Sequence, residues 1–177
     1  MLEVMVSLLI ISVLISATSV GISTAQRSAK TAKSRDTARQ VATAWSVYLL
    51  DNRSFPDKGS LSTKKIDGTS SVSGNAAGGP YFPMNNDNMA KLNGKGKSYL
   101  EFSNKELEKG VSKAVVSDAW GNAILFTLDF DYNGKIDTPA AAVTQKATQV
   151  NAAALALSYG DPRYKGRKNG KWVVAWQ

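Results

Sequence analysis

The chain of 177 residues contains no cysteine and no histidine, and its 22 basic and 14 acidic side chains give a formal charge of +8. Disulfides, thiolate metal sites and thiol nucleophiles are therefore excluded, together with the commonest general base and the commonest zinc ligand. Ser-His-Asp and Cys-His catalysis is ruled out, and we expect a protein that is not an enzyme.

An uncharged, mostly apolar segment covers residues 4–22, and no proline occurs in the first 52 residues. These 19 residues would span about 28 Å as an α-helix, close to the thickness of the hydrocarbon core of a bilayer. A secretory signal peptide begins with a basic region, whereas this sequence begins Met1-Leu2-Glu3. The pattern favours a retained transmembrane or filament-core helix over residues 1–26.

The helix is expected to continue as an amphipathic segment over residues 27–52. The apolar residues that recur at helical spacing are Ala38, Val41, Ala42, Trp45, Tyr48 and Leu49. Arg35, Arg39 and Thr43 occupy the other face. Gly21 is the expected soft spot, because glycine lowers helix propensity and the neighbouring Ser and Thr side chains compete for backbone hydrogen bonds.

Positive charge is concentrated in two stretches, residues 27–39 and residues 163–171. Their basic residues are Arg27, Lys30, Lys33, Arg35 and Arg39 in the first, and Arg163, Lys165, Arg167, Lys168 and Lys171 in the second. Solvated faces explain such stretches most simply, and nucleic acid or another anionic surface is the less favoured partner.

Glu3 is the only charged residue among the first 26. A carboxylate beside an apolar helix either reaches the membrane edge or pairs with a cation, such as the terminal amine of a neighbouring chain. Residues 2–11, LEVMVSLLII, resemble the start of mature type IV pilins and type II secretion pseudopilins. The family glutamate is usually the fifth mature residue and here it is the third. We therefore expect two further residues, and the short basic leader of the family, upstream of this sequence.

The resemblance implies a structural subunit that polymerises through its N-terminal helix, with Glu3 serving assembly and the helix loosening near Gly21. The implied partners are copies of the chain in a helical filament, an inner-membrane assembly platform and a prepilin peptidase. The implied location of the monomer is the bacterial inner membrane, with its domain facing the periplasm. The assembled filament would reach the cell surface or span the periplasm.

Turn-forming residues dominate residues 53–97 and predict a long irregular connection. Four short strands are expected after it, over residues 99–102, 113–116, 123–129 and 171–176. The expected fold class is α+β, with the long helix packed on a small antiparallel sheet with long loops. The expected divisions are 1–26 and 27–52 for the helix, 53–97 for the connection and 98–177 for the sheet domain.

Residues 117–122 read Ser-Asp-Ala-Trp-Gly-Asn. The resembled family often carries Asp-Pro-Trp-Gly-Asn just before a strand, and here alanine replaces the proline. We expect Asp118, Trp120, Gly121 and Asn122 to form a tight turn with a buried indole, which shapes the fold and does no chemistry.

Residues 129–137 match the first nine positions of an EF-hand calcium loop, with oxygen side chains at alternate positions and a glycine for the bend. The residues at the ligand positions are Asp129, Asp131, Asn133, Lys135 (through its carbonyl) and Asp137. Ala140 stands where an EF-hand has its bidentate glutamate, so an Asp/Asn-rich turn without metal is the alternative. The resembled pseudopilins hold calcium in a C-terminal loop with a different ligand pattern, and we expect calcium as the cofactor.

Two other functions stay open. One is a monomeric membrane-anchored periplasmic domain that binds calcium or another ligand. The other is a minor pilin that binds DNA or anionic surfaces through the basic tail, in which Tyr159, Tyr164 and Trp172 are interleaved. Within the leading function, the missing disulfide and the pairing of Trp-Gly-Asn with a calcium loop favour a pseudopilin over a pilin.

Overall fold

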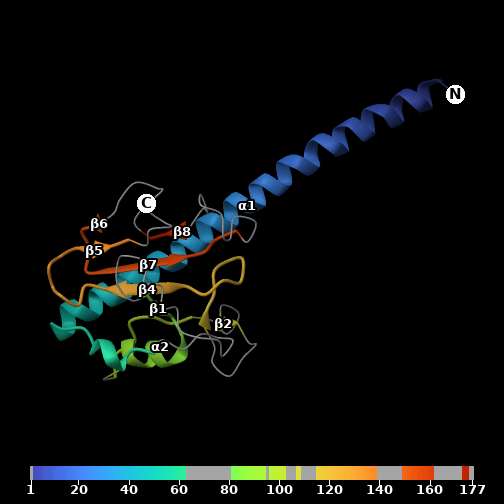
Figure 1. Ribbon diagram of the computed structural model, residues 1–177. Coiled ribbons are helices and arrows are strands. Elements are labelled where there is room, and N and C mark those ends of the chain that lie inside the picture. Colours follow the sequence, from blue (N-terminus) through green and yellow to red (C-terminus); the bar gives the residue numbers. More distant parts are fainter. Residues whose placement is uncertain are drawn as a thin grey trace.

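The computed structural model describes residues 2–62, 81–94, 96–102, 107–108, 115–138, 149–161 and 173–175, without the side chains of residues 2, 15–21, 107 and 108. A long helix, α1 (Leu2–Asn52), packs across a small antiparallel sheet. The first half of the helix projects away from the sheet and loops (Figure 1). The expected α+β class, with a long N-terminal helix and an antiparallel sheet, is confirmed.

The C-terminal half of α1 buries one face against the sheet. Ala38, Val41 and Trp45 are completely buried. The Trp45 ring stacks on Phe126 with centroids 5.0 Å apart and meets the Tyr48 ring edge-on at 5.6 Å. Because these helix residues recur at the helical period, they share one face, as the sequence predicts.

α1 ends at Asn52, where the next residue turns into the left-handed region. Arg53 has a φ of 58° and donates its N–H to the Leu49 carbonyl at 2.7 Å. The Asn52 side chain donates to the Tyr48 carbonyl at 3.0 Å. Two carbonyls of the last helical turn are thus satisfied, and Pro56 follows where a helix could not resume.

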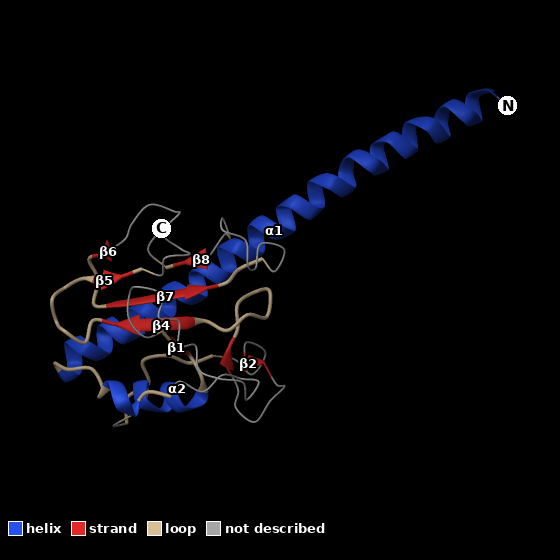
Figure 2. Ribbon diagram, viewed as in Figure 1, coloured by secondary structure: helices blue, strands red, loops and turns tan. Residues whose placement is uncertain are grey.

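The main sheet has four antiparallel strands in the order β1-β4-β7-β8, and Figure 2 shows α1 crossing them. The strands are β1 (Phe82–Pro83), β4 (Leu125–Leu128), β7 (Ala154–Ser158) and β8 (Val173–Val174). Phe126 lies opposite Ala156, and both belong to the core that includes α1. Leu125 and Leu157 point to the other face and form a second cluster with Val174. The central strands are therefore buried on both faces.

The remaining elements are the 3-10 helix η1 (Lys58–Ser60), helix α2 (Asn86–Leu92), the paired strands β2 (Leu107–Glu108) and β3 (Val115–Val116), and the paired strands β5 (Ile136–Asp137) and β6 (Gln149–Val150). The strands expected over 113–116, 123–129 and 171–176 correspond to β3, β4 and β8. Parts of the first and last of these ranges lie outside the described residues.

Residues 53–97 are less irregular than expected, because they contain η1, β1 and α2. The Asn85 side chain caps α2 by accepting the backbone N–H of Asn88 at 2.9 Å. Asn88 is itself buried, and its amide donates to the carbonyls of Pro83 at 2.8 Å and Ser62 at 3.0 Å. In the sequence, Asn85 and Asn88 indicate a turn. In the structure, Asn85 caps α2 and Asn88 anchors it to the preceding residues.

The strand expected over residues 99–102 is wrong. The Asn93 side-chain oxygen accepts the backbone N–H groups of Tyr99 at 3.0 Å and Leu100 at 3.2 Å. The Asn93 amide also donates to the Leu100 carbonyl at 2.7 Å. Since a side chain already satisfies both backbone groups of Leu100, they are not free to pair with a neighbouring strand.

Candidate assembly site

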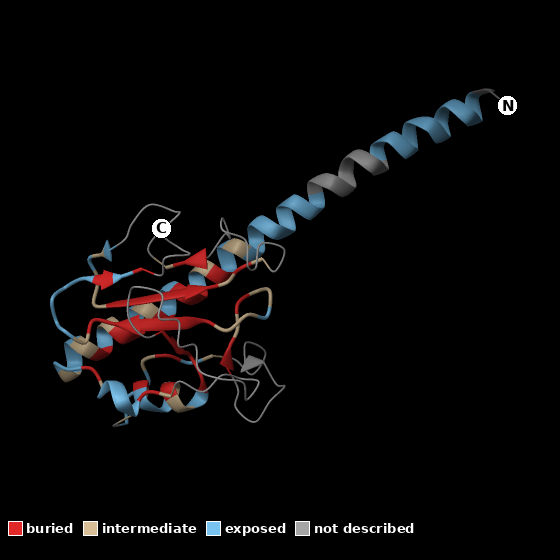
Figure 3. Cartoon of the chain, viewed as in Figure 1, coloured by how far each residue is buried: buried red, intermediate tan, exposed pale blue. Residues whose placement is uncertain are grey.

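Outside residues 15–21, the N-terminal half of α1 is exposed (Figure 3). Its large apolar side chains are not covered by any other described part of the chain. Each of them is between 50% and 72% exposed. They are Val4, Met5, Val6, Leu8, Leu9, Ile10, Ile11, Val13, Leu14 and Ile22. Soluble monomers rarely expose contiguous apolar patches larger than a few hundred Å², and burying these side chains would contribute on the order of 10 kcal/mol. We call residues 4–22 the apolar stem.

The stem also contains polar groups, and those described are satisfied within the helix. The hydroxyls of Ser7 and Ser12 donate to the backbone carbonyls of Glu3 and Leu9, each at 2.8 Å. Hydroxyls bonded in this way can enter an apolar environment without leaving a donor unpaired. Among the residues that the structure describes, which do not include the side chains of residues 15–21, no helix is long and apolar enough to cross a membrane.

The two predicted assembly residues lie in or next to the stem. The Glu3 side chain is exposed, and its carboxylate has no partner among the described residues. α1 runs as one helix through Gly21. The pairing of Glu3 with a neighbouring chain and the loosening at Gly21 both concern the assembled filament, so they stay predictions.

Three exposed cations, Arg27, Lys30 and Lys33, follow the stem, and we call them the basic collar. They form no ion pair within the described part of the chain. The first buried residues of α1 come next: Ser34 and Thr37, whose hydroxyls donate to the carbonyls of Lys30 at 2.8 Å and Lys33 at 3.1 Å. The collar therefore separates the stem from the packed half of the helix.

The Asp118 carboxylate organises the turn that precedes β4. One of its oxygens accepts the backbone N–H groups of Trp120 and Asn122, each at 2.8 Å. Its other oxygen accepts the Asn122 amide at 3.2 Å and the hydroxyl of Ser158 in β7. The buried carboxylate thus joins the turn to the central strand pair.

The same turn is also attached to α1. The Ala119 N–H donates to the Ser34 hydroxyl oxygen at 3.0 Å, a bond that proline, the usual residue of the resembled family, could not form. Gly121 has a φ of 82°, which glycine adopts without strain. Trp120 is only partly buried, in contrast to the expected buried indole.

The loop between β4 and β5 brings the five predicted calcium ligands to one hollow of about 180 Å³. Those residues are Asp129, Asp131, Asn133, Lys135 and Asp137. Oxygen donors of this kind suit calcium. Among the described residues, however, no three acidic side chains are grouped closely enough to hold a metal ion.

Several of the loop oxygens already accept hydrogen bonds. Asp129 is buried, and its two carboxylate oxygens accept the backbone N–H groups of Asn133 at 3.3 Å and Gly134 at 2.6 Å. The Asp137 carboxylate accepts the Gln149 amide at 2.8 Å. The donor types therefore fit calcium, while the bonds are also those of an Asp/Asn-rich turn. Calcium binding stays a prediction.

Tyr132 connects this loop to the chain that leaves α1. Its backbone has a φ of 52°, unusual for a non-glycine residue. Its hydroxyl oxygen accepts the backbone N–H of Phe55 at 2.8 Å, and the two rings stack with centroids 6.0 Å apart. Phe55 also meets Phe130 edge-on at 6.3 Å. The loop is thereby held against the first residues of the connection.

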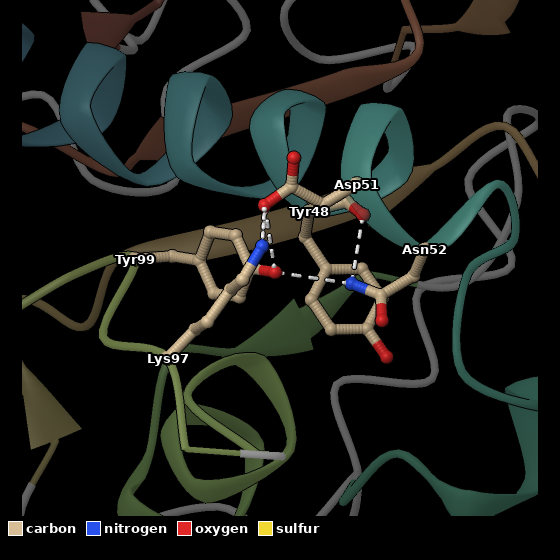
Figure 4. A network of polar contacts seen from close by, with 5 residues as sticks. All are labelled: Tyr48, Asp51, Asn52, Lys97 and Tyr99. Atoms are coloured by element: carbon tan, nitrogen blue, oxygen red, sulfur yellow. Dashed lines mark hydrogen bonds and ion pairs between the residues drawn. The ribbon is translucent and has the colours of Figure 1, made fainter.

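A polar cluster at the C-terminal end of α1 was not anticipated from the sequence (Figure 4). The Lys97 ammonium lies 2.9 Å from the Asp51 carboxylate, which also accepts the Tyr99 hydroxyl at 3.1 Å. The Asn52 amide donates to the Tyr99 oxygen at 3.2 Å. Lys97, and after it Tyr99, lower the pKa of Asp51. The partners stand 46 or more residues apart, so no local pattern signals the cluster.

Comparison with protein-family models, with curated proteins and with solved structures finds no match. The function must therefore be inferred from the residues and their geometry.

Proposed function

We propose that the protein is a structural subunit of a type IV-pilus-like filament, a pilin or a type II secretion pseudopilin, which polymerises through the apolar stem. The observation that supports this proposal most directly is the exposure of the stem. At least half of the surface of each described large apolar side chain in it is in contact with solvent. Copies of the same helix, packed side by side, would remove that surface from water.

The length of α1 fits a filament with a helical core. The helix has 51 residues, so it is about 75 Å long. Its packed half is held by the sheet through Trp45 and Phe126, while the stem extends beyond the domain (Figure 1). Stems can therefore gather in a core while the domains stay outside it.

Before assembly, we propose that a lipid bilayer surrounds the stem. The stem carries no charge, and the hydroxyls of Ser7 and Ser12 are bonded to the helix backbone. The resemblance at residues 2–11 supports the same location: the bacterial inner membrane, with the domain in the periplasm. There the prepilin peptidase and the assembly platform would act on the monomer.

A second candidate is a monomeric membrane-anchored domain that binds calcium. The observation that favours it is the shared hollow of the Asp129–Asp137 loop, which all five predicted ligands line. The two candidates differ in what the stem does, because a monomer needs the stem only as an anchor. They are separated by whether the purified chain polymerises.

The test is to remove detergent from the purified full-length protein and to look for filaments by electron microscopy and sedimentation. Leu9→Asp in the stem should abolish filaments, because a buried carboxylate without a partner costs several kcal/mol. The matched control is Leu50→Asp, since Leu50 is 78% exposed on the packed half of the same helix, against 65% for Leu9 in the stem. We expect the control to polymerise like the wild type. A wild-type chain that stays monomeric without detergent would disprove the proposed function.

A further inference from the structure

The basic collar has an uncompensated charge. No acidic residue occurs between Glu3 and Asp36, and Asp36, three residues after Lys33, is the one acidic residue near the collar in the sequence. The Asp36 carboxylate accepts the Gln40 amide at 2.9 Å and forms no ion pair with the collar, so the three cations outnumber it. The three collar side chains are exposed and form no ion pair within the described residues. Three cations spaced three residues apart point to an anionic partner outside the chain.

The position of the collar along the helix limits what that partner is. Arg27 stands five residues beyond Ile22, and Lys33 stands eleven beyond it. These separations correspond to about 7.5 Å and 16 Å along the axis. The headgroup layer of a bilayer is roughly 5–8 Å thick on each side. Because Cα–Cβ bonds tilt toward the helix N-terminus, the side chains of Arg27 and Lys30 lean back toward the stem and reach that layer. Lys33 lies just outside the layer, within the screening length of about 10 Å at 0.1 M salt.

The collar also lies under the globular domain. Lys30 and Lys33 stand one helical turn before Ser34 and Thr37, the first residues that the domain buries. Residues four apart share one helix face, so the two lysines emerge below the sheet domain on its own side. An anionic surface that faces the underside of the domain therefore meets these cations.

We infer that the collar binds the phosphates of anionic lipid headgroups while the stem is in the bilayer. The inference rests on the proposed membrane-inserted monomer and adds the chemistry of its lipid contact. A cation near an anionic membrane surface raises binding about fivefold, so three raise it roughly a hundredfold. The interaction weakens with salt, because the screening length falls from about 10 Å at 0.1 M to about 4 Å at 0.5 M.

The test offers full-length protein two vesicle populations in the same tube. One contains phosphatidylcholine alone, and the other contains phosphatidylcholine and phosphatidylglycerol at a ratio of 3:1. The measured quantity is the ratio of protein recovered on the anionic and on the neutral vesicles. The collar variant carries Arg27→Gln, Lys30→Gln and Lys33→Gln. The control variant removes the same charge from exposed positions of the globular domain, with Arg53→Gln, Lys58→Gln and Lys91→Gln.

We expect the wild type and the control to favour the anionic vesicles strongly at 0.1 M salt, and the collar variant to lose that preference by roughly a hundredfold. A collar variant that keeps the preference, or a control that loses as much, overturns the inference. Equal binding of the wild type to both populations also overturns it, but leaves the proposed membrane anchor intact. Binding to neither population overturns both.

Nucleic acid is the competing anionic partner, and a parallel titration with a fluorescent 20-base-pair duplex tests it. The inference expects the three substitutions to change duplex binding no more than the control substitutions do. If the collar variant loses duplex binding and keeps its preference for anionic vesicles, the collar is a nucleic-acid contact and the lipid assignment is wrong.

Discussion

The stem and the packed half of α1 belong to one helix, yet their apolar side chains have opposite surroundings. In the stem, every described large apolar side chain is at least half exposed. In the packed half, Ala38, Val41 and Trp45 are completely buried against the sheet of the same chain. The stem carries apolar residues around the helix, while the packed half places most of them in one stripe and leaves only Val47 and Leu50 exposed among its described large apolar residues. The pattern around the helix therefore determines whether a segment can be covered by its own domain.

Substitutions in the two halves of α1 should change two different properties: the free energy of unfolding and the contacts with other molecules. A change in the packed half should lower the free energy of unfolding, because that half forms part of the core. A change in the stem should leave unfolding unaltered and act on contacts with other molecules. Each prediction below tests this separation, and the largest effect comes first.

Trp45→Ala is expected to have the largest effect. The indole is completely buried and stacks on Phe126, so its removal should lower the free energy of unfolding by about 3–5 kcal/mol. Leu9→Ala in the stem should change it by less than about 0.5 kcal/mol. Denaturant titration in detergent, followed by circular dichroism, measures both. Equal losses would show that the stem belongs to the cooperative fold.

Asp118→Ala tests the turn before β4, which bonds to β7 through Asp118 and to the packed half of α1 through Ala119. The buried carboxylate accepts four hydrogen bonds, from Trp120, Asn122 and Ser158. Leaving these donors without their acceptor should cost roughly 2–4 kcal/mol in the same titration. The control is Asp57→Ala, at an exposed aspartate, where a change below about 0.5 kcal/mol is expected. A loss at Asp118 no larger than at Asp57 would contradict the role of the turn.

The sequence predicts the parts of the fold that have a periodic signal. The helical spacing of Val41, Trp45 and Tyr48 is strong, and the packed half of α1 is correct to its last residue. The alternation in residues 123–129 likewise predicts β4. Ala154–Ser158, which forms β7, was missed, because its alanines and leucines lack the β-branched side chains that mark strands. This segment forms a strand because it pairs with β4 along its edge and both of its faces are buried.

Side chains that satisfy distant backbone groups are the second source of error. The Asn93 side chain hydrogen-bonds to both the N–H and the carbonyl of Leu100, and this prevents the strand expected there. Asn85 caps α2 inside a stretch that reads as loop. Within the candidate site, the stem, the collar and the ligand positions of the loop are visible in sequence. Their surroundings are not, and neither is the contact between Asp51 and Lys97, because both depend on long-range packing.

Glu3→Leu should separate assembly from folding. The Glu3 carboxylate is exposed and has no partner among the described residues, so the unfolding free energy of the domain should change by less than about 0.5 kcal/mol. If Glu3 pairs with the terminal amine of a neighbouring chain, filament yield should fall about tenfold or more, since a buried charge left alone is costly. Glu3→Gln keeps the shape of the side chain and removes its charge, so a fall in filament yield with this variant would be due to the lost charge. Normal filament yield from Glu3→Leu would rule out the pairing.

Calcium should stabilise the domain by a smaller amount. Binding to the native state alone contributes about 1.4 kcal/mol at a tenfold excess over Kd. Melting of the full-length protein in detergent should therefore occur at a higher temperature in millimolar calcium than in chelator, at matched ionic strength. Asp131→Ala should remove that difference, while the matched Asp57→Ala, outside the loop, should keep it. Identical melting of the wild type in both conditions would leave only an Asp/Asn-rich turn.

The smallest effect is expected from Asp51 at the end of the packed half. Lys97, followed by Tyr99, lowers the pKa of Asp51 in the folded protein. A carboxyl whose pKa is lower in the folded than in the unfolded state stabilises the fold above its unfolded pKa, and this stabilisation is lost as the pH falls through the folded pKa. Asp51→Asn should therefore lower the melting temperature slightly at neutral pH and have no effect below the pH at which Asp51 is protonated.

Because the Asp51–Lys97 pair is exposed to solvent, high salt should weaken the difference at neutral pH. The control is Asp57→Asn, at an exposed aspartate without a lysine partner among the described residues, which should leave the melting temperature unchanged at neutral pH. An Asp51→Asn effect that is equal at acid and neutral pH would mean that the side chain acts through packing and not through its charge.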